Sequence, residues 1–145
     1  MSRPVKPPQQ KIKAHREKSP IINPKISVTL QYLTANKTFN FEFFGKNFRE
    51  KVTAFEQFTE FLRRLTSKTP LQISMLSKTD DCGFETMTFA QIKFSPRNVV
   101  LGNDTKIHVF RFGIGDGYRL LGFFETGQAI FNIIGFDFNY SAYEH

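Results

Sequence analysis

The chain has 145 residues, which suits one domain large enough to bury a core, and that core must be built from rings because the sequence contains 18 Phe, four Tyr and no Trp. A single cysteine excludes an intramolecular disulfide, and one cysteine with three scattered histidines does not form a zinc site. No signal peptide opens the chain, and no apolar run approaches the roughly 20 residues of a membrane span. We therefore predict a cytoplasmic protein with no metal, no cofactor and no membrane contact.

The net charge of +7 is concentrated at the N-terminal end. Residues 1–25 carry seven basic residues, one acidic residue and five prolines, whereas residues 26–145 have a net charge of only +1. A segment so rich in charge and proline cannot bury enough apolar surface to offset its ordering entropy. This pattern predicts a flexible basic tail over 1–25 and a single domain over 26–145. The tail is either a solvated segment or an arm that docks on nucleic acid or a partner.

The first predicted elements of the domain are two strands. Apolar and polar residues alternate over 26–32 and again over 39–43, with period two, and residues 34–37 have the composition of a turn. We therefore expect these two strands to form a hairpin.

A long amphipathic helix and a short helix are predicted next. Asn47 and Glu50 form a capping-box-like start, and apolar residues then recur every three or four positions, which predicts a helix over 47–66. Thr69 followed by Pro70 is typical of a helix start, so a short helix is expected over 70–78. The apolar stripe predicted to face the core comprises Phe48, Val52, Phe55, Phe58, Phe61, Leu62 and Leu65.

The C-terminal part of the chain reads as strands joined by turns. A mixed strand is expected around 84–94, and the segments KIHVFRF, YRLLGFFE and AIFNIIGFDF then form three strands separated by GIGDG and TGQ. The GIGDG segment predicts a hairpin turn rather than a phosphate loop, because strands lie on both of its sides. The fold class is therefore α+β: an antiparallel sheet with a C-terminal three-strand meander, covered by one long and one short helix.

Two arginines fall on neighbouring strands of this apolar sheet. In an antiparallel pair, Arg111 and Arg119 meet across the turn on the same face if the register allows it. Two adjacent cations require an anion, which is either a phosphate or an internal carboxylate such as Glu85, Glu125 or Asp137.

An aromatic, titratable ending follows the last strand. Tyr140, Tyr143 and His145 gather within six residues. Histidine exchanges protons near neutral pH, and tyrosine positions or donates a proton. A frayed terminus is the alternative interpretation. Serine hydrolysis is not predicted because no serine lies on a glycine elbow, and Cys82 has no identifiable base.

The segment GYRLLGFFETGQAIFNIIGFDFNYSAYEH is similar to the C-terminal half of toxins of the RelE/ParE superfamily. Those proteins show a strand bearing Lys or Arg, a turn, a GYRL-type strand, an apolar strand and a short ending with a tyrosine. The two predicted helices fall where that family keeps its helices. The resemblance covers residues 38–145, is sharpest over 106–145, and implies a RelE-like α+β fold.

The resemblance also implies a function. Members of the RelE type cut mRNA in the ribosomal A site without a metal, by attack of the 2′-OH on the adjacent phosphate. By position, Arg119 would stabilise the transition state, Arg111 and Lys106 would hold phosphate, and Tyr143 and His145 would serve proton transfer. Such a reaction needs cationic and proton-donating groups because charge develops on the phosphorane. The resemblance further implies a cognate antitoxin protein as a partner, beside mRNA and the ribosome.

Two alternatives stay open. The segment FDFN offers no basic residue after the last strand, where the family often has one, and the domain is nearly neutral. Those features favour a non-catalytic binding module whose basic tail docks on RNA, the ribosome or another protein. A ParE-type gyrase poison, which acts through protein contacts, is the other alternative.

Overall fold

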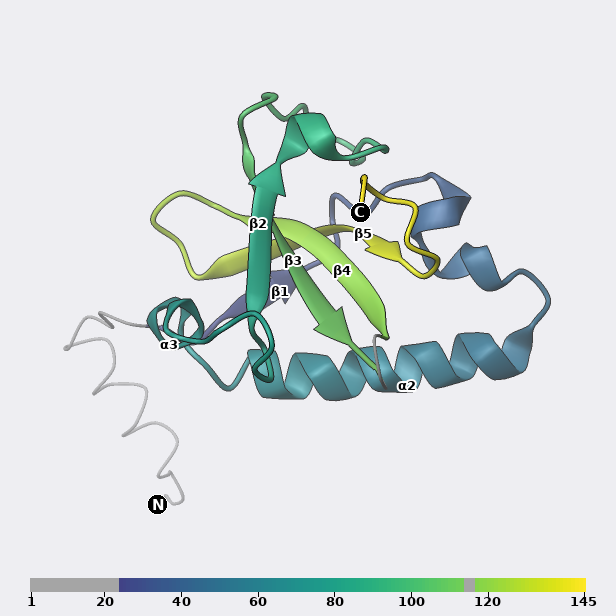
Figure 1. The fold of residues 1–145 in the computed structure, drawn as a ribbon, viewed down its shortest axis with the longest axis horizontal. Coiled ribbons are helices and arrows are strands. Elements are labelled where there is room, and N and C mark those ends of the chain that lie inside the picture. Colours follow the sequence, from purple (N-terminus) through teal and green to yellow (C-terminus); the bar gives the residue numbers. More distant parts are fainter. Residues whose placement is uncertain (1–23, 114–116) are drawn as a thin grey trace, which may run out of the picture.

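The computed structural model describes residues 24–113 and 117–145, which form a five-stranded sheet with two α-helices (Figure 1). This confirms the α+β class. Residues 1–23 of the predicted tail and residues 114–116 of the predicted GIGDG turn lie outside the described residues. The strands are β1 (Ser27–Thr29), β2 (Phe84–Thr88), β3 (Lys106–Phe112), β4 (Tyr118–Phe124) and β5 (Ile130–Asp137), and the helices are α2 (Phe48–Leu65) and α3 (Pro70–Ser74).

The strands lie side by side in the order β1-β5-β4-β3-β2. β2, β3, β4 and β5 pair antiparallel in chain order, whereas β1 pairs parallel with β5. Helix α2 packs on one face of this sheet, and the C-terminal segment after β5 lies on the opposite side (Figure 1). Among the described helices, none has the length and apolar character needed to cross a membrane.

The predicted N-terminal hairpin was wrong. β1 is only three residues long and pairs with β5, and the segment expected to be the second strand forms two 3-10 helices, η1 (Lys37–Phe39) and η2 (Phe41–Phe44). The side chains of Asn36 and Asn40 accept backbone N–H groups at the start of these helices, and such local capping competes with strand pairing. The alternating phenylalanines instead divide between the two faces of the sheet: Phe39 packs on one face and Phe41 on the other.

Helix α3 and strand β2 are shorter than predicted. Helix α3 ends at Ser74, although the capping box between Thr69 and Gln72 is present. Strand β2 ends at Thr88 because the chain turns into a third 3-10 helix, η3 (Phe89–Gln91).

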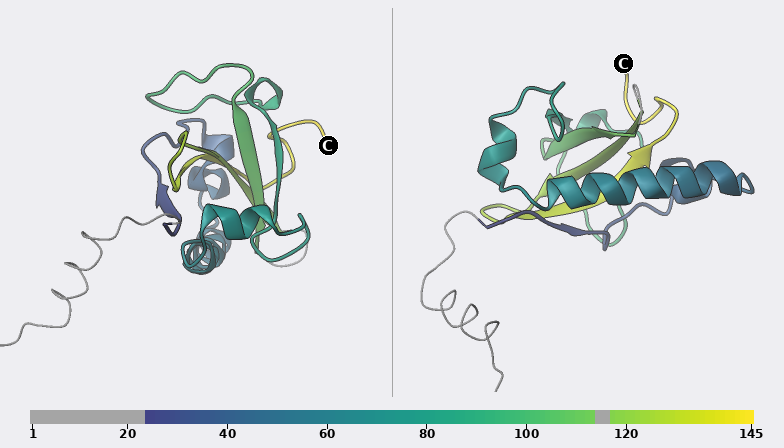
Figure 2. Two further views of the ribbon diagram at one scale, coloured as in Figure 1. Left: turned by 90° about the vertical axis from the view of Figure 1, so that its left-hand side faces the viewer. Right: turned by 90° about the horizontal axis from the view of Figure 1, so that it is seen from below.

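Helix α2 matches the predicted helix within a residue at each end, and the side chain of Asn47 caps it. Only the C-terminal half of its apolar stripe is buried, where Phe58, Phe61 and Leu65 pack against the sheet. The N-terminal half of the helix extends past the strands (Figures 1 and 2). The expectation that the whole stripe faces the core was therefore wrong, because Phe48, Val52 and Phe55 are exposed. We call these three residues the exposed helix stripe.

A bulge in β5 decides which of its side chains face α2. The pairing with β4 jumps from Leu121–Gly135 to Gly122–Ile133, which leaves Ile134 as an extra residue. Side chains on either side of the bulge can therefore share one face: Phe131, Ile133 and Phe136 all join the core under α2. Ile134 lies in the core on the other face.

His108 is half-buried among rings on the α2 side of the sheet. Its ring lies 4.7 Å from that of Phe84 and 5.0 Å from that of Phe124, and its Nδ1 atom is buried without a hydrogen-bond partner. Burial, and then the charge of Lys106, lower the pKa of His108 to about 4. The imidazole is therefore neutral in the folded protein at pH 7.

This burial predicts acid sensitivity. The unfolded chain protonates His108 near pH 6.5, whereas the folded chain resists protonation down to about pH 4. Stability is therefore full above pH 6.5 and falls as the pH drops toward 4, by about 3 kcal/mol in total. Urea unfolding of the wild type and of His108→Leu from pH 4 to pH 7 measures this, because only the wild type should lose the His108 contribution. A difference between the two proteins that does not change with pH would contradict the buried neutral imidazole.

Candidate functional site

The register of the sheet places three charged residues side by side on neighbouring strands. Arg111 of β3 lies opposite Arg119 of β4, as the sequence predicted, and Arg119 lies opposite Asp137 of β5. All three lie on the face away from α2, because Leu120 and Phe136, their neighbours in sequence, belong to the core under α2. The row is asymmetric: Arg111 is exposed, whereas Arg119 and Asp137 are buried.

Arg119 is a buried cation that forms no ion pair within the described part of the chain. The residue is 6% exposed, and its guanidinium carbon lies 4.4 Å from the centre of the Tyr140 ring. Among the described residues Arg119 forms no salt bridge, and its buried Nε atom has no hydrogen-bond partner. Burial lowers the pKa of Arg119, but its interactions with Tyr140, Tyr143 and Asp137 outweigh that effect and raise the pKa above its ordinary value. The guanidinium is therefore charged and largely desolvated, and its buried Nε–H group has no acceptor among the described residues.

Asp137 fixes the segment that covers this arginine. Its Oδ1 atom accepts the backbone N–H groups of Asn139 and Ser141 at 3.3 and 3.0 Å, and its Oδ2 atom accepts that of Ala142 at 3.3 Å. The chain after β5 therefore folds back over the sheet. It carries Ala142 and Tyr143 into the core on the face away from α2.

Three rings meet beside Arg119. The His145 ring lies 5.0 Å from the Tyr140 ring and 4.3 Å from the Tyr143 ring, and its Nε2 atom lies 3.7 Å from Oδ2 of Asp137. Tyr140 adopts a φ of +61°, in the left-handed region that non-glycine residues rarely occupy. We call Arg119, Asp137, Tyr140, Tyr143 and His145 the terminal cluster. His145 therefore packs against the domain in this structure rather than fraying from it.

Tyr143 is a buried phenol whose proton is held firmly. Burial, together with the nearby carboxylate of Glu85, raises the pKa of Tyr143 above its ordinary value of 10. Its hydroxyl therefore keeps its proton at neutral pH and can donate a hydrogen bond to an anion.

Lys106 is not brought to the terminal cluster. It begins β3, opposite Thr88 of β2, whereas Arg111 lies five residues further along the same strand. Five residues of a strand span roughly 16 Å, and an odd separation also places the two side chains on opposite faces. The other four predicted residues, Arg111, Arg119, Tyr143 and His145, do come together around the start of β4 and the end of β5.

Asp137 and Tyr140 belong to the site, although neither was among the five predicted site residues. The sequence offered Asp137 only as one of three carboxylates, and the register selects it as the one beside Arg119. Glu125 lies past the other end of β4, and Glu85 lies nearer Tyr143. The sequence identified Tyr140 as a site residue only weakly, because it is one of several aromatic residues near the end of the chain.

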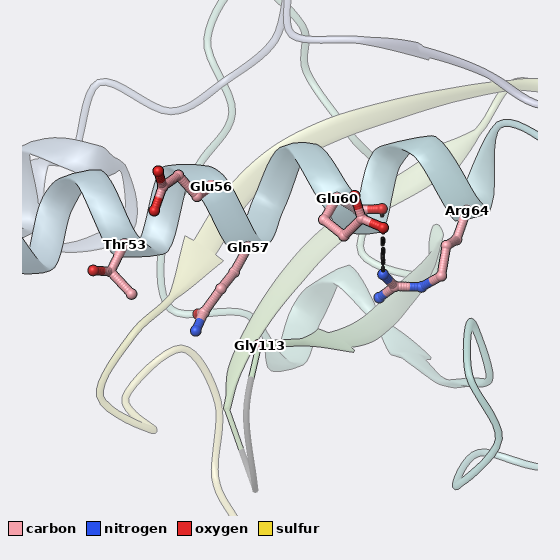
Figure 3. A pocket seen from close by; sticks show the side chains of 6 residues that line it. All are labelled: Thr53, Glu56, Gln57, Glu60, Arg64 and Gly113. Atoms are coloured by element: carbon pink, nitrogen blue, oxygen red, sulfur yellow. Dashed lines mark hydrogen bonds and ion pairs between the residues drawn. The ribbon is translucent and has the colours of Figure 1, made fainter.

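A separate hollow of about 380 Å³ lies along α2 (Figure 3). It is lined by polar side chains of the helix and by the end of β3, and within it Glu60 contacts Arg64. None of the predicted site residues lines this hollow. The lining residues are Thr53, Glu56, Gln57, Glu60, Arg64 and Gly113.

Among the described residues, no three His, Cys, Asp or Glu side chains lie close enough together to hold a metal ion. No protein-family model, curated protein or solved structure matches this chain. The functional interpretation therefore depends on the geometry of the terminal cluster and on the motif that runs through its strands.

Proposed function

We propose that this chain is the toxin of a toxin–antitoxin system, a RelE-like endoribonuclease that cuts mRNA on the ribosome without a metal. The observation that supports this most directly is Arg119, a buried cation that forms no ion pair with any described residue and lies beside the exposed Arg111. A desolvated guanidinium is expensive unless something uses it. A phosphate that enters beside the two arginines would add a second anion to the buried carboxylate of Asp137.

The proposed reaction is attack of a ribose 2′-OH on the adjacent phosphate. The 2′-OH loses its proton as the bond from O2′ to phosphorus forms, and the leaving O5′ takes up a proton as its bond to phosphorus breaks. The products carry a 2′,3′-cyclic phosphate and a 5′-hydroxyl. Negative charge grows on the phosphorane oxygens, and Arg119 stabilises it more strongly in a buried site than it would in water. Arg111, at the exposed end of the pair, holds the substrate phosphate.

Two further groups of the terminal cluster handle protons. His145 lies between Tyr140 and Tyr143 and places an imidazole, the side chain most often used in general acid–base catalysis, within the cluster. Tyr143 keeps its proton and donates to a phosphate oxygen. The half-exposed ring of Tyr140 lies over Arg119 and offers its outer face to a nucleobase, as aromatic side chains do for single-stranded RNA.

A protein partner is part of this proposal. The exposed helix stripe presents three large apolar side chains, four and three residues apart, on one side of α2. Apolar surface of this kind is typical of protein-binding sites. An antitoxin that covers it would neutralise the toxin by holding it in a complex away from the ribosome.

A non-catalytic binding module is the second candidate, and the nearly neutral domain together with the exposed helix stripe favours it. Deletion of residues 1–25 discriminates between the two. A nuclease should keep measurable RNA cleavage without the tail, because the tail holds none of the proposed site residues. A binding module that uses the tail should lose its RNA, ribosome or protein partner in a pull-down.

Controlled induction of the wild type and of Arg119→Ala in bacteria tests the proposal. Labelled methionine incorporation should fall in cells with the wild type and not in cells with the variant, while thymidine incorporation continues. Arg49→Ala, which changes an exposed arginine of α2, serves as the matched control and should arrest translation like the wild type. A primary fall in thymidine incorporation would instead indicate a ParE-type gyrase poison, and no arrest of either would favour the binding module.

A further inference from the structure

We propose that Asp137 is a positioning residue that orients His145 for proton transfer. This inference rests on the proposed ribonuclease function and assigns it a residue that the sequence motif does not identify. Its starting point is a carboxylate whose side chain is completely buried and whose Oδ2 atom lies 3.7 Å from Nε2 of His145.

The two carboxylate oxygens of Asp137 contact different groups. Oδ1 accepts two backbone N–H groups, those of Asn139 and Ser141, which fixes the turn after β5. Oδ2 accepts one N–H group, that of Ala142, and also faces the imidazole. One side chain therefore sets both the path of the C-terminal segment and the direction of the ring that the segment carries.

The direction of the ring decides which nitrogen reacts. Because Nε2 of His145 faces Asp137, Nδ1 is the nitrogen left to exchange a proton with RNA. A buried carboxylate in this position holds an imidazole in one orientation and stabilises the imidazolium that forms when the ring takes a proton.

The carboxylate does more than anchor the backbone. Three backbone N–H groups use both of its oxygens, and an asparagine in its place would keep one oxygen and turn its NH2 group toward the remaining N–H donor. A buried carboxylate is also costly unless a cation lies close to it. Arg119 lies opposite Asp137 in register without a direct salt bridge between them, and the charge of Asp137 helps to raise the pKa of Arg119. Among the described residues, other charged groups near the cluster are Arg111, Glu85 of β2, which acts on Tyr143, and Glu144, which pairs with Lys93. The negative charge of Asp137 therefore acts on two groups, Arg119 and the imidazole of His145, whose Nε2 atom lies 3.7 Å from Oδ2.

A double-mutant cycle on RNA cleavage tests this. Asp137→Asn is expected to lower kcat about 100-fold and to leave KM within about twofold, because the change affects proton transfer and not phosphate binding. His145→Ala should cost about as much, and the double variant should be no worse than His145→Ala alone. Ser141→Ala is the matched control: it perturbs the same turn by removing the bond from Ser141 Oγ to Asn139 Oδ1, and should leave kcat within about threefold.

The outcomes separate this inference from the function on which it rests. If the wild type cleaves RNA but the losses in kcat from the two substitutions multiply in the double variant, Asp137 does not act through His145. That result overturns the inference and leaves the proposed function standing. If the wild type cleaves no RNA, the proposed function is wrong and the positioning role falls with it. Urea unfolding checks that each variant is folded. Should Asp137→Asn not fold, Asp137→Glu takes its place in the cycle, since it keeps the charge and displaces the carboxylate.

Discussion

Replacement of Arg119 by methionine is expected to lower RNA cleavage about a thousandfold, because loss of one preorganised donor to a developing oxyanion costs about 10²–10³ in rate and Arg119 also carries a full charge. The side chain is buried, so its charge is only weakly screened by water. Methionine is chosen because it keeps the long, unbranched shape under the Tyr140 ring. Single-turnover cleavage of mRNA on programmed ribosomes measures the effect.

Arg111, which lies opposite Arg119 on β3, provides the control substitution. Arg111→Ala removes an exposed charge, so we expect about a tenfold weaker binding of substrate with little change in the single-turnover rate at saturation. Arg119→Met also deprives Asp137 of a neighbouring charge, which should cost about 1–3 kcal/mol of stability and leave the chain folded. Equal and small effects of both substitutions would show that the arginine pair has no catalytic role.

Phe61→Ala is expected to give the largest loss of stability, about 3–5 kcal/mol, because the ring is fully buried and its removal leaves a cavity. Phe61 packs from α2 onto the sheet, with its ring centre 5.7 Å from that of Phe110 and 6.3 Å from that of Phe112. Urea unfolding at pH 7, above the range in which His108 protonates, measures the loss directly.

Phe48→Ala on the same helix is the matched control. This side chain is 66% exposed and lies in the exposed helix stripe, so its loss should change the free energy of unfolding by no more than about 0.5 kcal/mol. If Phe48→Ala cost as much as Phe61→Ala, the N-terminal half of α2 would be covered in solution, and the stripe would not be a free surface.

Part of the fold follows from the sequence because its signals are local. The cap at Asn47 and the spacing of the phenylalanines define α2, and the short turns of the C-terminal strands set the register of Arg111 against Arg119. The prediction of an N-terminal hairpin was wrong because of a competing local signal. Asn36 and Asn40 cap 3-10 helices where the alternation of apolar and polar residues alone suggested a strand. The prediction that the whole apolar stripe of α2 faces the core was wrong for a non-local reason, because the width of the sheet decides how much of the helix is covered.

The candidate site was also predictable from the sequence only in part. Arg119 and its neighbour across the turn were predictable from strand parity. The position of Asp137 was not, because the bulge at Ile134 changes the parity along β5 and lets Asp137 share a face with Arg119 while Phe131 and Phe136 stay under α2. Burial of Arg119 was also hidden, since it depends on the turn that Asp137 holds and on the Tyr140 ring above it.

The most direct test of the ribonuclease account is the chemistry of the cut ends. The purified full-length chain is incubated with mRNA on programmed ribosomes in excess EDTA, and the termini are identified by mass spectrometry. The account predicts fragments with a 2′,3′-cyclic phosphate and a 5′-hydroxyl, formed by the wild type and lost in Arg119→Met. Intact mRNA, or cuts that leave a 5′-phosphate or that EDTA abolishes, would contradict it.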